Sequence, residues 1–145
     1  MKAAAAALVI GLAIPSLAGA QDLTGAWSYA TQKSWHKGPC PMGSDAKGVL
    51  EIKVTKKKTF TLVFKTGRVC KPKSMCSFKG TVKGPKYVGK NSAKVDNEGG
   101  TATNTITLTA KSDKEAEGSS HSKYVHPGGM VCTWGSKVVK LTRKK

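Results

Sequence analysis

Residues 48–66 read GVLEIKVTKKKTFTLVFKT, and they contain two runs in which apolar and polar residues alternate. Alternation with a period of two is typical of a β-strand that has one buried face and one wet face. The three lysines of Lys56-Lys57-Lys58 separate the two runs and indicate a hairpin turn. The stretch therefore predicts two antiparallel strands of a sheet that is covered on one side.

The same pattern continues outward in both directions along the chain. Gly, Pro, Asn and Asp separate the alternating runs, with the strongest turn chemistry at residues 83–86, 96–100 and 126–129. No run has a helical period. Eight strands are expected: Leu23–Thr31, Gly48–Lys56, Thr59–Thr66, Met75–Lys83, Tyr87–Val95, Thr101–Lys111, Glu115–Val125 and Met130–Arg143. An all-β, antiparallel up-and-down β-barrel of about eight strands would leave no free sheet edge.

Residues 1–20 are expected to be a cleavable secretory signal peptide. Lys2 precedes an apolar run that ends at Leu17, and Ala18-Gly19-Ala20 has the small-x-small pattern of a cleavage site. A membrane anchor is the alternative, which the short apolar run disfavours, and no later segment is apolar enough to be transmembrane. Residues 21–145 are then a single domain that is secreted or periplasmic.

The chain is strongly basic, with a formal net charge of +17. Residues 1–20 contain one lysine and no acidic residue, so the mature domain would carry +16. Lysine far outnumbers arginine, which favours diffuse attraction to anionic polymers such as lipopolysaccharide and acidic glycans, without sequence-specific nucleic acid recognition. The alternative is that the lysines only keep the sheet soluble. The expected contacts are Lys56, Lys57, Lys58, Lys71 and Lys73.

The two ends of the mature chain carry a further pattern. Gly25-Ala26-Trp27 lies in the first expected strand and Arg143 in the last, on the faces assigned to the interior. This pattern resembles the calycin barrels, which include the lipocalins and avidin-like proteins. The resemblance implies that the first and last strands are neighbours and that Arg143 lies across the Trp27 ring at the closed end, where the cation gains attraction to the indole face.

Four cysteines, an even number in an exported chain, indicate two disulfides with three possible pairings. In an up-and-down barrel, the connections that hold Cys40, Cys70, Cys76 and Cys132 share one end. That placement favours Cys70–Cys76 as a local clasp and Cys40–Cys132 as a tie for a long loop over residues 32–47. A zinc site is the alternative, but no Cys-x-x-Cys or His-x-x-x-His occurs, so no metal is expected.

A ligand site is expected at that same end of the barrel. Ser120, Ser122 and Tyr124 share one strand face, and Asn104 on the neighbouring strand could face them. A lumen wall with hydroxyl and amide groups can hold a small polar ligand. The opposite register, with the serines outside, stays open because this strand lacks the apolar residues that fix a register. The residues expected to line the mouth are Trp35, His36, Tyr124 and His126.

Catalytic patterns are missing from the sequence. It has no nucleophile elbow and no glycine-rich phosphate loop, so neither an enzyme nor a cofactor is expected. The leading hypothesis is a binding protein for a small polar or anionic ligand. Some secreted bacterial protease inhibitors use a similar barrel, so an inhibitor of a secreted hydrolase, of protease or lysozyme type, is one alternative. A basic envelope or surface protein that binds anionic polymers is the other.

Overall fold

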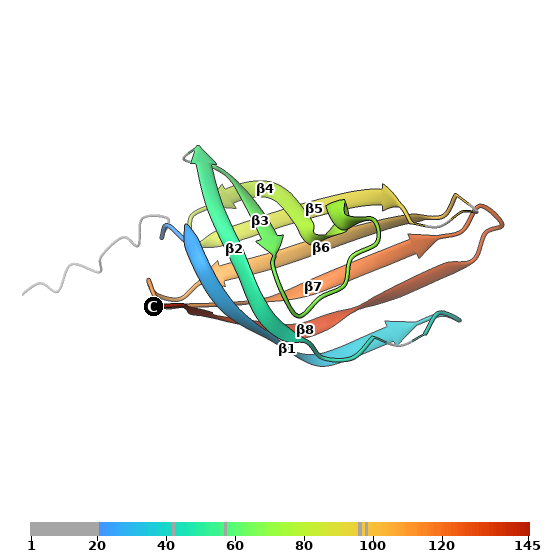
Figure 1. Ribbon diagram of the computed structural model, residues 1–145, viewed down its shortest axis with the longest axis horizontal. Helices are drawn as coiled ribbons and strands as arrows, with labels where there is room; N and C mark the ends of the chain where they lie inside the picture. The colour runs from blue at the N-terminus through green and yellow to red at the C-terminus, as the bar shows by residue number, and fades with distance from the viewer. Residues whose placement is uncertain (1–20, 42, 57, 96, 98) are drawn as a thin grey trace, which may run out of the picture.

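The protein is an eight-stranded, closed antiparallel β-barrel in a computed structural model that describes residues 21–145, apart from residues 42, 57, 96 and 98. The expected signal peptide lies outside the described residues. Each strand pairs with the next along the chain, and β8 pairs with β1 to close the barrel (Figure 1). The strands are β1 (Gly25–Lys37), β2 (Lys47–Lys56), β3 (Thr59–Phe64), β4 (Ser77–Lys83), β5 (Lys86–Lys94), β6 (Thr101–Ala110), β7 (Glu115–Val125) and β8 (Val131–Arg143). The predicted fold class is confirmed.

Most predicted strand ends lie within two residues of the observed ones, and two of the differences change the local structure. Strand β1 continues six residues beyond Thr31, because it stays paired with β8 as far as Lys37 opposite Thr133. The long loop expected over residues 32–47 is therefore shorter and begins after Lys37. Met75, expected to begin the fourth strand, lies instead in a short 3-10 helix, η1 (Lys73–Cys76). No helix among the described residues is long and apolar enough to span a bilayer.

The apolar core fills the half of the barrel near the chain termini. Its largest fully buried side chains come from seven of the strands and from the segment before β1, namely Leu23, Trp27, Leu50, Ile52, Phe60, Leu62, Phe78, Tyr87, Ile106, Leu108, Val139 and Leu141. Gly89 makes this packing possible, since a Cβ atom there would lie 3.1 Å from the Phe60 ring and 3.3 Å from the Phe78 Cβ. This half is a packed interior in which side chains replace any lumen.

Arg143 closes this end of the barrel. Its guanidinium lies over the Trp27 ring, 4.3 Å from the ring centroid. Its nitrogens donate hydrogen bonds to the backbone carbonyls of Asp22, Thr24 and Asp113. Gly25 leaves the necessary space, because a Cβ atom there would lie 2.7 Å from Arg143 Nη1, and its φ of 135° suits glycine. The first and last strands are thereby joined through one side chain.

Strands β1 and β8 reverse which side chains face inward about halfway along their length. In β1, Thr31 and Ser34 both border the interior, and Lys33 between them has a left-handed φ of 55°. In β8, Ser136 and Val139 are both buried, so the alternation shifts there as well. The neighbouring strand β7 has one residue fewer at this level, and the β7–β8 register shifts. Between this shift and the end of the barrel opposite Arg143, hydroxyl groups line the inner wall in place of apolar side chains.

Candidate ligand-binding site in the barrel mouth

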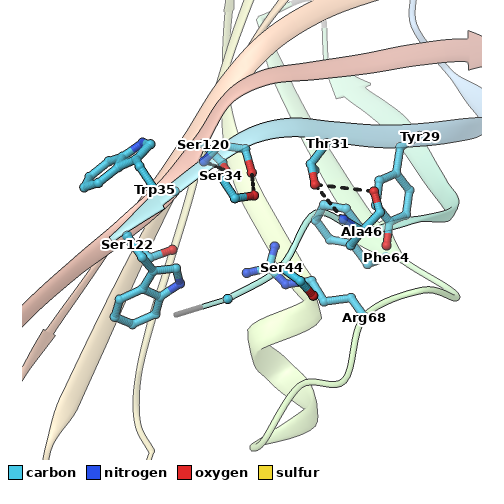
Figure 2. Close-up of a pocket in the computed structure, with 14 residues that line it drawn as sticks. Tyr29, Thr31, Ser34, Trp35, Ser44, Ala46, Phe64, Arg68, Ser120 and Ser122 are labelled. Atoms are coloured by element: carbon cyan, nitrogen blue, oxygen red, sulfur yellow. Dashed lines mark hydrogen bonds between the residues drawn. The ribbon is translucent and has the colours of Figure 1, made fainter. Parts of the chain in front are cut away.

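Three adjoining hollows occupy the end of the barrel opposite Arg143, which we call the mouth. Their volumes are about 200, 360 and 210 Å³, and Trp134 of β8 borders all three. Tyr124 of β7 borders the second and third, and Arg68 borders the first and third. The shared residues make the hollows parts of one concave region. Figure 2 shows the first of them.

The β1–β2 connection folds back across the mouth and is fixed there at three points. The Cys40–Cys132 disulfide ties its start to β8. The Asp45 carboxylate accepts hydrogen bonds from the backbone N–H, at 3.2 Å, and the hydroxyl of Ser34. The Ala46 N–H donates to the Thr31 hydroxyl at 2.8 Å. Ser44 and Ala46 consequently form one side of the first hollow.

The β3–β4 connection forms the opposite side and is also fixed. Cys70 and Cys76 are joined by the second disulfide. The Tyr29 hydroxyl donates to the Thr66 carbonyl at 2.9 Å. Gly67 has a φ of 79°, and a Cβ atom there would lie 2.0 Å from the Lys47 carbonyl oxygen, so only glycine fits. The two disulfides join the pairs expected from the strand order, and they indicate an oxidising environment.

Hydroxyl groups from three neighbouring strands line the first hollow. Ser34 of β1 and Ser136 of β8 share a hydrogen bond of 3.3 Å between their Oγ atoms. The Ser136 N–H donates to Ser120 Oγ of β7 at 3.2 Å. Ser122 is 3% exposed and borders the same hollow. Of the two registers that the sequence left open for β7, the structure has the one with Ser120 and Ser122 inside.

Arg68 places a positive charge at the first hollow of the mouth, and Lys71 borders the third. Its guanidinium carbon lies 5.1 Å from the centroid of the Phe64 ring, and Figure 2 shows the side chain reaching across the hollow toward Ser44. Arg68 is exposed at the edge of the hollow, and partial desolvation of its guanidinium lowers the pKa, although arginine stays charged at physiological pH. In the part of the chain that the structure describes, Arg68 has no hydrogen-bonded or ion-paired carboxylate.

Arg68 and the apolar surroundings act in opposite directions on Tyr29. Burial raises the pKa of the Tyr29 hydroxyl, and the positive charge of Arg68 lowers it by a smaller amount. The Tyr29 ring packs edge-on against Phe64, with 4.8 Å between the ring centroids. The phenol is thus kept protonated at neutral pH and serves as a hydrogen-bond donor to the loop backbone.

The Asn104 side chain borders the third hollow and is hydrogen-bonded to a second amide, Asn91, behind it. Asn104 is 4% exposed, and its Nδ2 donates to Asn91 Oδ1 at 2.7 Å. Asn91 Nδ2 donates in turn to the backbone carbonyls of Met75, at 2.8 Å, and Ser77, at 3.1 Å. Asn104 lies directly opposite Ser122 in the β6–β7 pairing, as expected. Asn91 thus holds η1 in place, and Asn104 lines the mouth.

The aromatic and histidine side chains that were expected to line the mouth together take different positions, although the Tyr124 and His126 rings remain neighbours, with 6.5 Å between their centroids. Tyr124 does line the mouth, next to Trp134. Trp35 borders the first hollow, but its ring turns away from Arg68 in Figure 2 and lies 5.6 Å from the His121 ring. The prediction of Trp35 in a loop was wrong, because β1 stays paired with β8 as far as Lys37. The shift at Lys33 turns the Trp35 ring outward.

The two histidines predicted for the mouth border none of the hollows. His36 is exposed near the end of β1, where it was expected in a loop. His126 lies in the β7–β8 turn, where its Nδ1 accepts the Gly128 N–H at 2.9 Å. That contact gives His126 a local role in shaping the turn.

The sequence interpretation missed Arg68 and Trp134. Arg68 lies in an irregular loop where alternation gives no information about direction. Trp134 lies on the mouth side of the reversal in β8, whereas Val139 and Leu141 lie on the other side. Its inward direction could therefore not be read from their parity. A useful signal was available for Arg68, since it is the one arginine of the chain besides Arg143.

The lysines predicted to form an anionic contact surface lie at different ends of the barrel. Lys71 and Lys73 are exposed beside the mouth, and Lys58 is exposed at the opposite end, in the β2–β3 turn. Lys56 ends β2, and Lys57 lies outside the described residues. They do not form one continuous patch.

Comparison with protein-family models, curated proteins and solved structures finds no significant match to this chain. The fold and the mouth therefore define the class to which it can be assigned, a closed eight-stranded antiparallel barrel with a polar hollow at one end. Among the described residues, no group of three His, Cys, Asp or Glu side chains is placed to hold a metal ion. The arrangement in the mouth suits hydrogen bonding and charge recognition.

Proposed function

We propose that the protein binds a small anionic, hydroxyl-bearing molecule in the mouth of its barrel. The observation that carries this proposal is the Arg68 guanidinium, which lies over the Phe64 ring at the edge of a hollow lined by hydroxyl groups and has no carboxylate paired to it among the described residues. A guanidinium offers a planar set of donors that matches a carboxylate or phosphate. Serine hydroxyls can donate to or accept from the rest of the ligand.

The size of the mouth limits the ligand. The first hollow, at about 200 Å³, is smaller than a typical drug-sized pocket of roughly 300–1,000 Å³. A ligand of the size of one sugar acid suits it, and a longer ligand would continue past Trp134 into the neighbouring hollow. Phe64 and Trp134 supply apolar faces beside the polar groups, which is the usual composition of a small-molecule site.

Two broader expectations belong to the same proposal. The contact of Arg143 with Trp27 supports a calycin-like barrel, because it has the geometry that the resemblance implied. The two disulfides support export through a signal peptide at residues 1–20, since such bonds persist in oxidising compartments. We thus propose an exported binding protein whose outer charge is separate from its ligand site.

The proposal is tested by titrating the protein with pairs of acidic and neutral sugars, such as galacturonate and galactose. We expect the acid to bind and to raise the melting temperature, and the neutral sugar to bind at least about tenfold more weakly, since a charged hydrogen bond is worth about 1.5–3 kcal/mol. Arg68→Gln should abolish the difference, and Arg68→Lys should restore part of it. Lys73→Gln, an exposed charge at the same end, is the matched control. Equal acid binding by wild type and Arg68→Gln would contradict the proposal.

A further inference from the structure

We infer that the outer wall of strands β2 to β5 is a binding face for an acidic polysaccharide. We call this surface the basic face and define it by five exposed lysines: Lys53, Lys79, Lys83, Lys86 and Lys90. It lies on the wall of the barrel, outside the mouth, and the inference does not depend on the ligand proposed there.

The strand register brings these lysines close together. Lys53 of β2 is opposite Thr61 of β3, and Thr61 is opposite Lys79 of β4. Lys79 is directly opposite Lys90 of β5, so one row crosses four strands. Neighbouring strands are about 4.8 Å apart, which gives a short, regular spacing between charges. A second pair, Lys83 opposite Lys86, lies next to this row at the β4–β5 turn.

Directly opposed like charges destabilise an antiparallel pair of strands. Lys79–Lys90 and Lys83–Lys86 are two such pairs in one hairpin. Elsewhere on the barrel, opposed charges are of opposite sign, as with Glu117 of β7 and Lys140 of β8. The repulsion in the β4–β5 hairpin is therefore a local feature that a bound polyanion would relieve.

Strands β3, β4, β5 and β6 contain no acidic residue. Between Glu51 and Asp113, the sequence has two acidic residues, Asp96 and Glu98, both in the connection between β5 and β6 and outside the described residues. The ion pair found among the described residues, Lys65 with Glu51 at 3.6 Å, involves none of the lysines of the basic face. Glu51 lies in β2, two residues from Lys53, and its carboxylate pairs with Lys65, so the lysines of β4 and β5 have no acidic partner on their own strands or on β3.

The chemistry of the basic face favours a polysaccharide over other polyanions. Its cations are all lysines, which act as point charges and suit spaced carboxylates or sulfates without bidentate geometry. Thr61 and Thr81 place hydroxyl groups between the charges, where they can bond to sugar hydroxyls. No aromatic side chain among the described residues of β2 to β5 faces outward to stack on bases, and the large exposed apolar side chains of the described chain lie outside these strands. These features disfavour single-stranded nucleic acid and membrane insertion.

Binding to polygalacturonate and heparin, at near-physiological salt, tests the inference. We expect both to bind and the affinity to fall as salt rises, because bound counterions are released. The double variant Lys79→Gln/Lys90→Gln should weaken binding by about tenfold, since two contacts to the polyanion are lost. The matched control, Lys37→Gln/Lys137→Gln, removes the same charge from β1 and β8 on the opposite side of the barrel and should change affinity less than twofold.

Three results would overturn the inference. The first is equal weakening by the two double variants, which would show that only the net charge matters. The second is no polysaccharide binding at physiological salt, and the third is tighter binding to single-stranded DNA or to phosphatidylglycerol vesicles than to either polysaccharide. Melting temperature guards against misfolding, because removal of the Lys79–Lys90 repulsion should leave it unchanged or raise it. Arg68→Gln should leave polysaccharide binding intact, so the two proposals fail separately.

Discussion

Arg143 lies over the ring of Trp27 and joins the last strand of the barrel to the first. The same guanidinium donates to three backbone carbonyls, two of them just before β1 and one in the β6–β7 turn. Trp27 is fully buried, and its Nε1 donates to the Leu23 carbonyl at 2.8 Å. One arginine therefore satisfies three backbone carbonyls from two segments while covering the largest side chain of the core.

Replacement of Arg143 by methionine should destabilise the barrel by about 2–3 kcal/mol. The variant keeps an apolar stem over Trp27 but loses the cation–π attraction and the hydrogen bonds to the three carbonyls. Urea denaturation followed by tryptophan fluorescence measures this change. Lys144→Met, at the next, exposed position, should change stability by less than about 0.5 kcal/mol. If both variants were equally stable, the contact of Arg143 with Trp27 would not contribute to the free energy of unfolding.

The two disulfides should differ in their effect on stability. Cys40 and Cys132 are 92 residues apart in sequence, whereas Cys70 and Cys76 are 6 apart. Closing a longer loop removes more entropy from the unfolded chain, so loss of Cys40–Cys132 should cost about 2 kcal/mol more than loss of Cys70–Cys76. Denaturation of the two paired Cys→Ser variants compares them directly. The reverse order would indicate that the unfolded chain is already compact.

Alkaline pH should destabilise the protein through its buried tyrosines. Burial raises the pKa of Tyr29 and of Tyr87 above the ordinary value of 10.0. The folded state thus holds its phenol protons longer than the unfolded state, so this stability is complete below the unfolded pKa and is lost as pH rises through the folded pKa. Tyr29→Phe should reduce the slope of stability against pH in that range, as measured by urea midpoints.

The charge of Arg68 gives this prediction a second readout. Because the guanidinium lowers the pKa of Tyr29, Arg68→Gln should move the tyrosinate absorbance transition of Tyr29 to higher pH. The Tyr29→Phe variant, which lacks that transition, identifies it in the spectrum. A shift to lower pH would show that Arg68 does not lie close to the phenol in solution.

Alternation in the sequence was sufficient to predict the number of strands and their order. The bounds of β7, Glu115–Val125, agree with the expectation because a polar turn flanks the strand on each side. The inward direction of Ser120 and Ser122 could not be chosen from β7 alone, since its neighbours decide it. Asn104 opposite Ser122 follows directly once the β6–β7 hairpin is placed.

The mouth was predicted less well, for two physical reasons. Lys33 adopts a left-handed conformation that glycine usually provides, so the sequence gives no warning that β1 changes phase there. Arg68 is positioned by tertiary contacts with Phe64 and by a loop fixed at Thr66 and Cys70. Neither the phase change at Lys33 nor the position of Arg68 leaves a pattern in the nearby sequence. Both decide which side chains reach the ligand site.

Because β1 and β8 change phase midway, the positions that tolerate polar substitutions are not the same, odd- or even-numbered, along the whole of either strand. Below Lys33, odd-numbered positions such as Trp27 and Tyr29 are buried and should reject polar replacements. Above it, even-numbered Ser34 borders the interior, and the ring of odd-numbered Trp35 is outside. A map of fitness against position would show tolerant and intolerant positions alternating along each strand, with the alternation reversed midway. The same two strands therefore build the apolar core at one end of the barrel and the polar wall of the mouth at the other.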